Sequence, residues 1–362
     1  MNNCNIIIPT YNRPAYLKRI LHYYNDCKIG YQIIVADSST YENKELNYRI
    51  IKQFPDLDIL YTGKYPNSIE ANRKIFQVLE LIKTKYCVIC GDDDFITPNG
   101  INQSADFLEN NQDFSVVQGY YVAFRIQNKV EKELQFEWKY TDSNQSIVFP
   151  DSEDRTSYHL SNYAVTTFYG VHRTNLLKMI FSESLKYSDD FYFGELLLTM
   201  LTLIYGKLKC LNILFAVRDS PVTHMYSPHI KQESLADYIK VGTYQEKYAR
   251  FVDCLSTHLS LQAQIDIEKS EEIINDAMST YLKKYVFPNI KTPWTTKISM
   301  SMERLNLPGW LDEGIRKAYR RFTGENDPKW FPLDAAASSP YYEELTRISH
   351  LVFSSLQMKS VL

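Results

Sequence analysis

Short apolar runs alternate with amphipathic stretches over the first hundred residues, and this alternation constrains the fold more than any other feature. The segments that read as strands are residues 5–9, 31–37, 55–63 and 85–90. Apolar side chains recur at helical spacing between them, within residues 13–27 and 68–84. Strands that alternate with helices are typical of a parallel sheet covered on both faces. We therefore predict an α/β domain with a mostly parallel, Rossmann-like sheet.

Polar residues stand where three of these predicted strands end. Pro9 and Thr10 close the first strand, Asp37 closes the second, and the run Asp92–Asp94 follows the fourth. Adjacent carboxylates repel one another unless a cation or water relieves the repulsion. Ligands of such sheets bind at the carboxyl ends of the strands. The sequence thus predicts a ligand site at this edge.

The remaining residues predict a mixed region followed by helices. Residues 114–124 and 132–140 predict a hairpin, residues 163–173 a strand, and residues 193–207 a buried helix capped by Gly206. From Lys231 onward the apolar spacing is helical. We expect a first domain at 1–230 and an α-helical C-terminal region at 231–362. Acceptor handling and homo-oligomer formation are alternative roles for that region.

Charge and hydropathy exclude several classes of protein. The net charge is −3 and the sequence pI is about 6.2, so no basic field attracts nucleic acid. No apolar run reaches the roughly 20 residues of a membrane span, and the N-terminus lacks the features of a secretory signal. We expect a cytoplasmic protein, with peripheral contact to the inner face of the membrane as an alternative. Cys87 and Cys90 point to opposite faces of one strand, which excludes a metal or redox pair.

Three segments together resemble a known family. They are IIIPTYNRP, IIVADSS and CGDDDFITP, and the resemblance runs from Asn5 to Arg218. They resemble the GT-A domain of family-two glycosyltransferases, inverting enzymes that build cell-surface polysaccharides from nucleotide sugars. The resemblance implies a hexosyltransferase with a UDP-linked sugar donor. It also implies a glycan or lipid-linked glycan acceptor and a divalent metal, Mn²⁺ or Mg²⁺.

The same resemblance assigns the aspartate run to the metal and the donor diphosphate. Asp92 and Asp94 match metal positions, and Asp92 and Asp93 match nucleotide contacts. Hard carboxylate oxygens suit Mg²⁺ or Mn²⁺. Gly91 stands where many relatives carry a first aspartate, so the metal-binding pair stays open. The alternative reading is a solvated acidic turn.

Further positions match the nucleotide loops of that family. Asp37 matches the acid that accepts a hydrogen bond from uracil, while Pro9, Thr10 and Tyr11 match the loop along the base and ribose, with Arg13 nearby. Arg73 falls in the segment that reaches the nucleotide, although the order of residues differs. Each has an ordinary alternative, namely a turn cap, a helix start or a solvated cation.

The resemblance also places a catalytic base and a metal-binding loop. Glu195 lies 11 residues before Gly206, where relatives carry an aspartate; Asp190, beside Asp189, is the alternative base. Such a carboxylate takes the proton of the acceptor hydroxyl. Its alternative role is an acid near a helix N-terminus. His224 falls in a loop that can supply a metal ligand, and its alternative is a surface histidine.

Two rival functions remain at this point. A nucleotidyltransferase also uses strand-end aspartates and a metal, but PTYNRPAYLKR has no glycine for a phosphate loop. The other rival is a catalytically inactive GT-A-like binding subunit, against which the intact aspartate run argues.

Overall fold

The structure, a computed structural model of the chain, describes residues 3–67, 69–128, 132–139, 146–163, 166–188, 191–220, 244–286 and 330–358. In these ranges a ten-stranded sheet has the order β10-β7-β6-β8-β4-β1-β2-β3, with β9 paired to β5 and β6. The strands are β1 (Cys4–Thr10), β2 (Gln32–Asp37), β3 (Ile59–Thr62), β4 (Tyr86–Ile89), β5 (Phe95–Ile96), β6 (Phe114–Asn128), β7 (Glu133–Lys139), β8 (Val171–Arg173), β9 (Lys207–Asp219) and β10 (Phe331–Pro332).

The sheet is parallel in its N-terminal part and mixed beyond it. β1 pairs in parallel with β2 and β4, and β2 with β3. β8 then pairs antiparallel with β4 and β6, and β7 antiparallel with β6. The predicted α/β class and the predicted hairpin are confirmed. The parallel pairing that we expected throughout most of the sheet holds for the first four strands and for β6 with β9.

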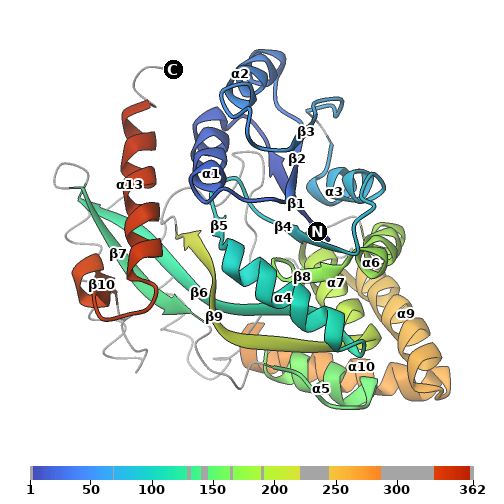
Figure 1. Cartoon of the computed structure of the whole chain (residues 1–362). Coiled ribbons are helices and arrows are strands. Elements are labelled where there is room, and N and C mark those ends of the chain that lie inside the picture. Colours follow the sequence, from blue (N-terminus) through green and yellow to red (C-terminus); the bar gives the residue numbers. More distant parts are fainter. Residues whose placement is uncertain are drawn as a thin grey trace, which may run out of the picture.

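Helices cover both faces of the sheet (Figure 1). They are α1 (Pro14–Asp26), α2 (Tyr41–Ile51), α3 (Ala71–Leu79), α4 (Pro98–Asn110), α5 (Ser152–Ser161), α6 (Thr174–Tyr187), α7 (Phe191–Tyr205), α9 (Tyr244–Ala263), α10 (Ile267–Tyr281) and α13 (Tyr342–Met358). Apolar residues of α1, α4 and α13 join the core on one face. Those of α3, α6, α7, α9 and α10 join the core on the other. No helix within the described ranges is long and apolar enough to span a membrane.

Alternating side chains divide each central strand between these two cores. In β1, Ile6 and Ile8 belong to one core and Ile7 to the other. Cys87 and Cys90 likewise lie in different cores, both as free thiols, as their spacing predicts. The period of two therefore fixes which helices each strand residue meets.

Two local predictions were wrong. The strand expected at residues 163–173 is reduced to β8, because a turn precedes it in which the amide of Gly170 donates to the carbonyl of Thr167 at 3.0 Å. Gly206 follows α7 but is not a left-handed cap. A Cβ atom there would lie 2.8 Å from the amide nitrogen of Ser115, so the glycine permits a close backbone approach.

Candidate active site

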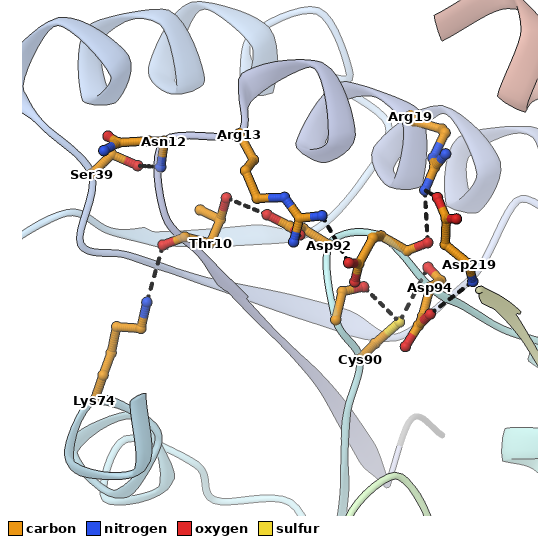
Figure 2. A network of polar contacts seen from close by, with 12 residues as sticks. Thr10, Asn12, Arg13, Arg19, Ser39, Lys74, Cys90, Asp92, Asp94 and Asp219 are labelled. Atoms are coloured by element: carbon orange, nitrogen blue, oxygen red, sulfur yellow. Dashed lines mark hydrogen bonds and ion pairs between the residues drawn. The ribbon is translucent and has the colours of Figure 1, made fainter. Parts of the chain in front are cut away.

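The carboxyl ends of β1, β2 and β4 meet at one edge of the sheet, as Figure 2 shows in part. The Thr10 hydroxyl at the end of β1 donates to Oδ2 of Asp92, just after β4, at 2.7 Å. Asp92 is only 3% exposed. Two positions that are 82 residues apart in sequence are thus joined in one buried hydrogen bond.

Arginines from this chain bind all three aspartates of the run. Arg13 contacts Asp92 at 2.9 Å and Asp93 at 2.7 Å, and Arg218 contacts Asp94 at 3.0 Å. Arg19 donates to the main-chain carbonyl of Asp93 at 2.6 Å. The positive charges of these arginines offset the repulsion between the adjacent carboxylates.

The three carboxylates differ in accessibility. Burial raises the pKa of Asp92, and Arg13 opposes the shift; burial also raises the pKa of Asp94, and there Arg218 opposes it. The Asp93 side chain is 27% exposed and is the most accessible of the three. A Cβ atom on Gly91 would lie 2.8 Å from Oδ1 of Asp93, so the glycine lets Asp93 fold back over the turn.

These residues fit a metal only in a particular way. No three carboxylate, histidine or cysteine side chains converge on one point in the part of the chain that the structure describes. Mg²⁺ is often held by one or two carboxylates together with water and substrate phosphates. Asp92, Asp93 and Asp94 fit that mode, in which the donor completes the coordination, and do not form a closed protein cage.

Asp37 is fully buried at the end of β2. Its Oδ1 accepts from the amide of Ser39 at 2.8 Å, and its Oδ2 accepts from Asn47 at 2.8 Å and from Tyr61 at 2.9 Å. Three hydrogen bonds from this chain therefore hold the carboxylate in the turn after β2. Its predicted contact with uracil stays a prediction.

Lys74 of α3 is a site residue that our sequence analysis missed. Its Nζ donates to the Thr10 carbonyl at 3.0 Å and to the Ser38 hydroxyl at 2.8 Å, and the residue is 4% exposed. Burial lowers the pKa of Lys74 to about 8, while the charges of Asp37 and Asp92 oppose the shift. Figure 2 shows Lys74 reaching the end of β1 from below. Lys74 thus ties β1 to β2 where the two acids lie.

The loop after β1 has an unusual backbone. Asn12 adopts φ 55, in the left-handed region that asparagine tolerates better than most residues. Its amide donates to the Ser39 hydroxyl at 2.8 Å, and its Oδ1 accepts from the amide of Thr40 at 2.9 Å. α1 then begins at Pro14, with Arg13 at the cap position. Asn12 therefore joins the loops that follow β1 and β2, which sets the position of Arg13.

Glu195 lies on α7, and the charge of Arg218 acts on its carboxyl group. Burial raises the pKa of Glu195, and the positive charge of Arg218 opposes the shift. Arg218 itself stacks on Tyr169, with Cζ 4.2 Å from the ring centroid, while it binds Asp94. The charge of Arg218 thus acts on the predicted base, while its guanidinium is bonded to Asp94 of the aspartate run.

The other predicted site residues divide into two groups. Pro9 and Tyr11 are half-buried at the end of β1, and Arg73 is exposed on α3. Asp190 and His224, with Asp189, lie outside the described residues. Their predicted roles stay predictions.

Comparison with known families gives one domain match. The family model described as glycosyl transferase family 2 matches residues 5–178. No curated protein matches the chain significantly.

Among solved structures, the chain is similar in fold to S. aureus TarS. One TarS structure matches with a TM-score of 0.51 and 13% identity, covering 79% of this chain and 44% of that chain. TarS 1-349 in complex with UDP-GlcNAc matches with a TM-score of 0.52 and 13% identity, covering 84% of this chain and 81% of that chain. The UDP complex of TarS 1-349 matches with a TM-score of 0.53 and 14% identity, covering 82% of this chain and 78% of that chain. The chain thus spans less than half of the longer TarS chain.

Proposed function

The chain carries a glycosyl transferase family 2 domain with the GT-A fold, and from this premise we propose a specific reaction. The enzyme transfers a hexose from a UDP-linked donor to a hydroxyl group of a glycan or lipid-linked glycan. The configuration at the anomeric carbon of the hexose is inverted in the transfer. The enzyme works on the cytoplasmic side in the synthesis of cell-surface glycans.

One observation carries the proposal. The Thr10–Asp92 hydrogen bond and the Lys74 bridge join the ends of β1, β2 and β4, where α/β sheets bind their ligands. UDP and UDP-GlcNAc are bound by TarS, whose fold this chain shares, which supports UDP as the nucleotide.

Each residue of the run has a part in the proposed reaction. Asp92, Asp93 and Asp94 would hold Mn²⁺ or Mg²⁺, which as a Lewis acid would neutralise the leaving diphosphate. Arg13 contacts two of these aspartates and orients them. Asp37 and the loop at Pro9, Thr10 and Tyr11 line the nucleotide.

The acceptor hydroxyl needs a base on the opposite side of the sugar from the leaving group. Glu195 takes this proton in our proposal, with Asp190 as the alternative. Burial raises the pKa of Glu195, which makes its carboxylate a stronger proton acceptor. His224 would add a metal ligand.

Calorimetry of UDP binding tests the donor site. We expect UDP to bind in the presence of Mn²⁺ and to lose most of its affinity with a chelator. Asp94→Asn should remove the metal dependence and lower turnover at least about a hundredfold. Asp106→Asn on α4, an exposed position, is the matched control. Equal UDP affinity with and without metal would refute metal bridging, and hydrolysis of a panel of nucleotide sugars would identify the donor.

A further inference from the structure

One face of the sheet continues from the candidate active site toward its edge. In neighbouring strands, paired residues project to the same face. Arg218 of β9 pairs with Ala123 of β6, which in turn pairs with Glu137 of β7. The opposite face carries Phe124 and Phe136, which pack in the core with α13. The row that begins at Arg218 therefore lies on the side away from α13.

The next row on this face contains Arg125 and Gln135. Residues two apart along a strand share a face at a spacing of about 7 Å. Nε and Nη2 of Arg125 both donate to Oε1 of Gln135, at 3.0 and 2.6 Å. The guanidinium also stacks on Trp330, with Cζ 4.4 Å from the ring centroid. Two contacts thus fix the plane of Arg125 beside the row of Arg218.

Among the described residues, no acid balances the charge of Arg125. Within the described ranges, no carboxylate lies at ion-pair distance from Arg125, and its hydrogen-bond partner Gln135 is neutral. The neighbouring charges are already paired, Arg218 with Asp94 at 3.0 Å and Lys139 with Glu137 at 2.7 Å. A stacked guanidinium with a free edge is suited to bind a carboxylate or phosphate group.

We propose that Arg125 and Trp330 form an acceptor subsite for a sugar unit that carries an anionic group, a carboxylate or a phosphate. The anion binds the free edge of Arg125, and the sugar ring contacts Trp330. The hydroxyl that reacts then lies toward Arg218 and Glu195. This inference rests on the proposed function, because it treats the active-site end of the row as the point of transfer.

Binding of small probes tests the subsite with the full chain saturated with UDP and Mn²⁺. The probes are methyl glucuronide and glucose 6-phosphate, with methyl glucoside as the neutral counterpart, followed by tryptophan fluorescence and calorimetry. We expect the better anionic probe to bind at least about tenfold more tightly than the neutral one. Comparing the two anions decides between a carboxylate and a phosphate.

Arg125→Gln should bring the anionic and neutral probes to equal affinity while UDP binding stays unchanged. Arg125→Lys keeps the charge and should retain part of the preference, which keeps the test valid if Arg125→Gln melts early. Lys52→Gln is the matched control, since Lys52 also lies over an aromatic ring, 4.4 Å from that of Tyr48 on α2.

Two results would overturn the subsite. One is equal binding of anionic and neutral probes to the unaltered protein, and the other is an undiminished anion preference in Arg125→Gln. Failure of UDP and Mn²⁺ to bind would instead refute the proposed function. The anion preference could still be measured then without nucleotide.

Discussion

Lys74 is the residue whose replacement most directly tests how the donor site is held together. Lys74→Met keeps the length of the side chain but leaves the Thr10 carbonyl and the Ser38 hydroxyl without their donor. Unpaired buried groups cost about 1–3 kcal/mol, so we expect UDP affinity to fall about tenfold or more. Arg73→Met, one residue earlier and exposed, is the control. If calorimetry gave equal UDP affinities for the two variants, the hydrogen bonds of Lys74 to Thr10 and Ser38 would have no role in donor binding.

Glu195 should carry the acid–base chemistry. Glu195→Gln retains the shape of the side chain and removes proton acceptance, so turnover should fall by about two to four orders of magnitude. UDP affinity should change little because the proposed base acts on the acceptor and not on the nucleotide. Full activity of Glu195→Gln, together with loss of activity in Asp190→Asn, would assign the base to Asp190.

Metal binding should depend on pH because two buried acids are hard to ionise. Burial raises the pKa of Asp92 to about 7 and that of Asp94 to about 6, from 3.8. The folded chain thus binds more protons than the unfolded chain between pH 4 and 7, and these groups lower stability as pH rises. A metal needs the ionised forms, so the Tm increase with Mn²⁺ and UDP should be larger at pH 8 than at pH 5.5. A pH-independent increase would contradict this account.

Part of this site was predictable from the residues alone. Thr10 and the aspartates could be predicted as site residues because they are polar and follow directly after apolar strand segments. Lys74 was missed although a signal existed: it lies four residues before the buried Val78, whereas Arg73 lies four before the exposed Gln77. The arginine partners of the aspartates could not be predicted, since Arg218 is 124 residues away from Asp94.

At the scale of elements, α13 packs against α1. The buried Tyr23 hydroxyl of α1 donates to Glu344 of α13, and Arg347 lies 3.6 Å from the same carboxylate. The Tyr23 ring meets Phe95 edge-on at 5.2 Å, and Phe95 directly follows Asp94. A helix from the end of the described chain thus supports the turn that carries the candidate site.

Tyr23→Phe should therefore lower the free energy of unfolding. A hydrogen bond to a charged group contributes about 1.5–3 kcal/mol, and we expect a loss in this range in chemical denaturation. Tyr86→Phe is a matched control because Tyr86 also donates to a carboxylate, that of the exposed Glu109, at 2.6 Å. Tyr86→Phe should lose less unfolding free energy, since water can replace the phenol as a hydrogen-bond donor to the exposed Glu109. Equal losses in both variants would show that α13 is not held through Tyr23.

Most elements could be predicted from periodicity, and the exceptions have physical causes. The alternation in the first hundred residues predicted β1, α1, β2 and β4, because each segment is long enough for its hydrophobic periodicity to be recognised. The antiparallel insertion of β8 between β4 and β6 could not be predicted. Pairing direction depends on long-range contacts, and Val171–Arg173 is too short to show a period.

At the scale of the whole molecule, the C-terminal helices complete the cores of the N-terminal sheet. Phe251, Leu255 and Leu259 of α9 are buried on one face, and Leu345 and Ile348 of α13 on the other. The division at residue 231 follows the sequence pattern and stays a prediction. These contacts connect the two predicted regions over both faces.

A chain that ends at residue 230 should accordingly fail to fold. Each buried apolar side chain contributes about 1.5–3 kcal/mol, so the loss of five is as large as the roughly 5–15 kcal/mol by which a typical domain is stable. We expect aggregation and loss of the cooperative melting transition, measured by light scattering and circular dichroism. A chain that ends at residue 358 should melt as the full chain does. Cooperative melting of the shorter chain would show that residues 1–230 form an independent domain.

The arginine contacts of the aspartate run have a consequence for how the protein is made. Arg13 and Arg218 supply counter-charges as soon as the chain has closed, so the nascent protein need not wait for a divalent ion to mature. If the aspartate run takes up Mn²⁺ as we propose, cells short of manganese would accumulate a folded pool of this protein that lacks only its metal. Restoring the ion would recruit that pool within the time of ligand exchange, without new synthesis.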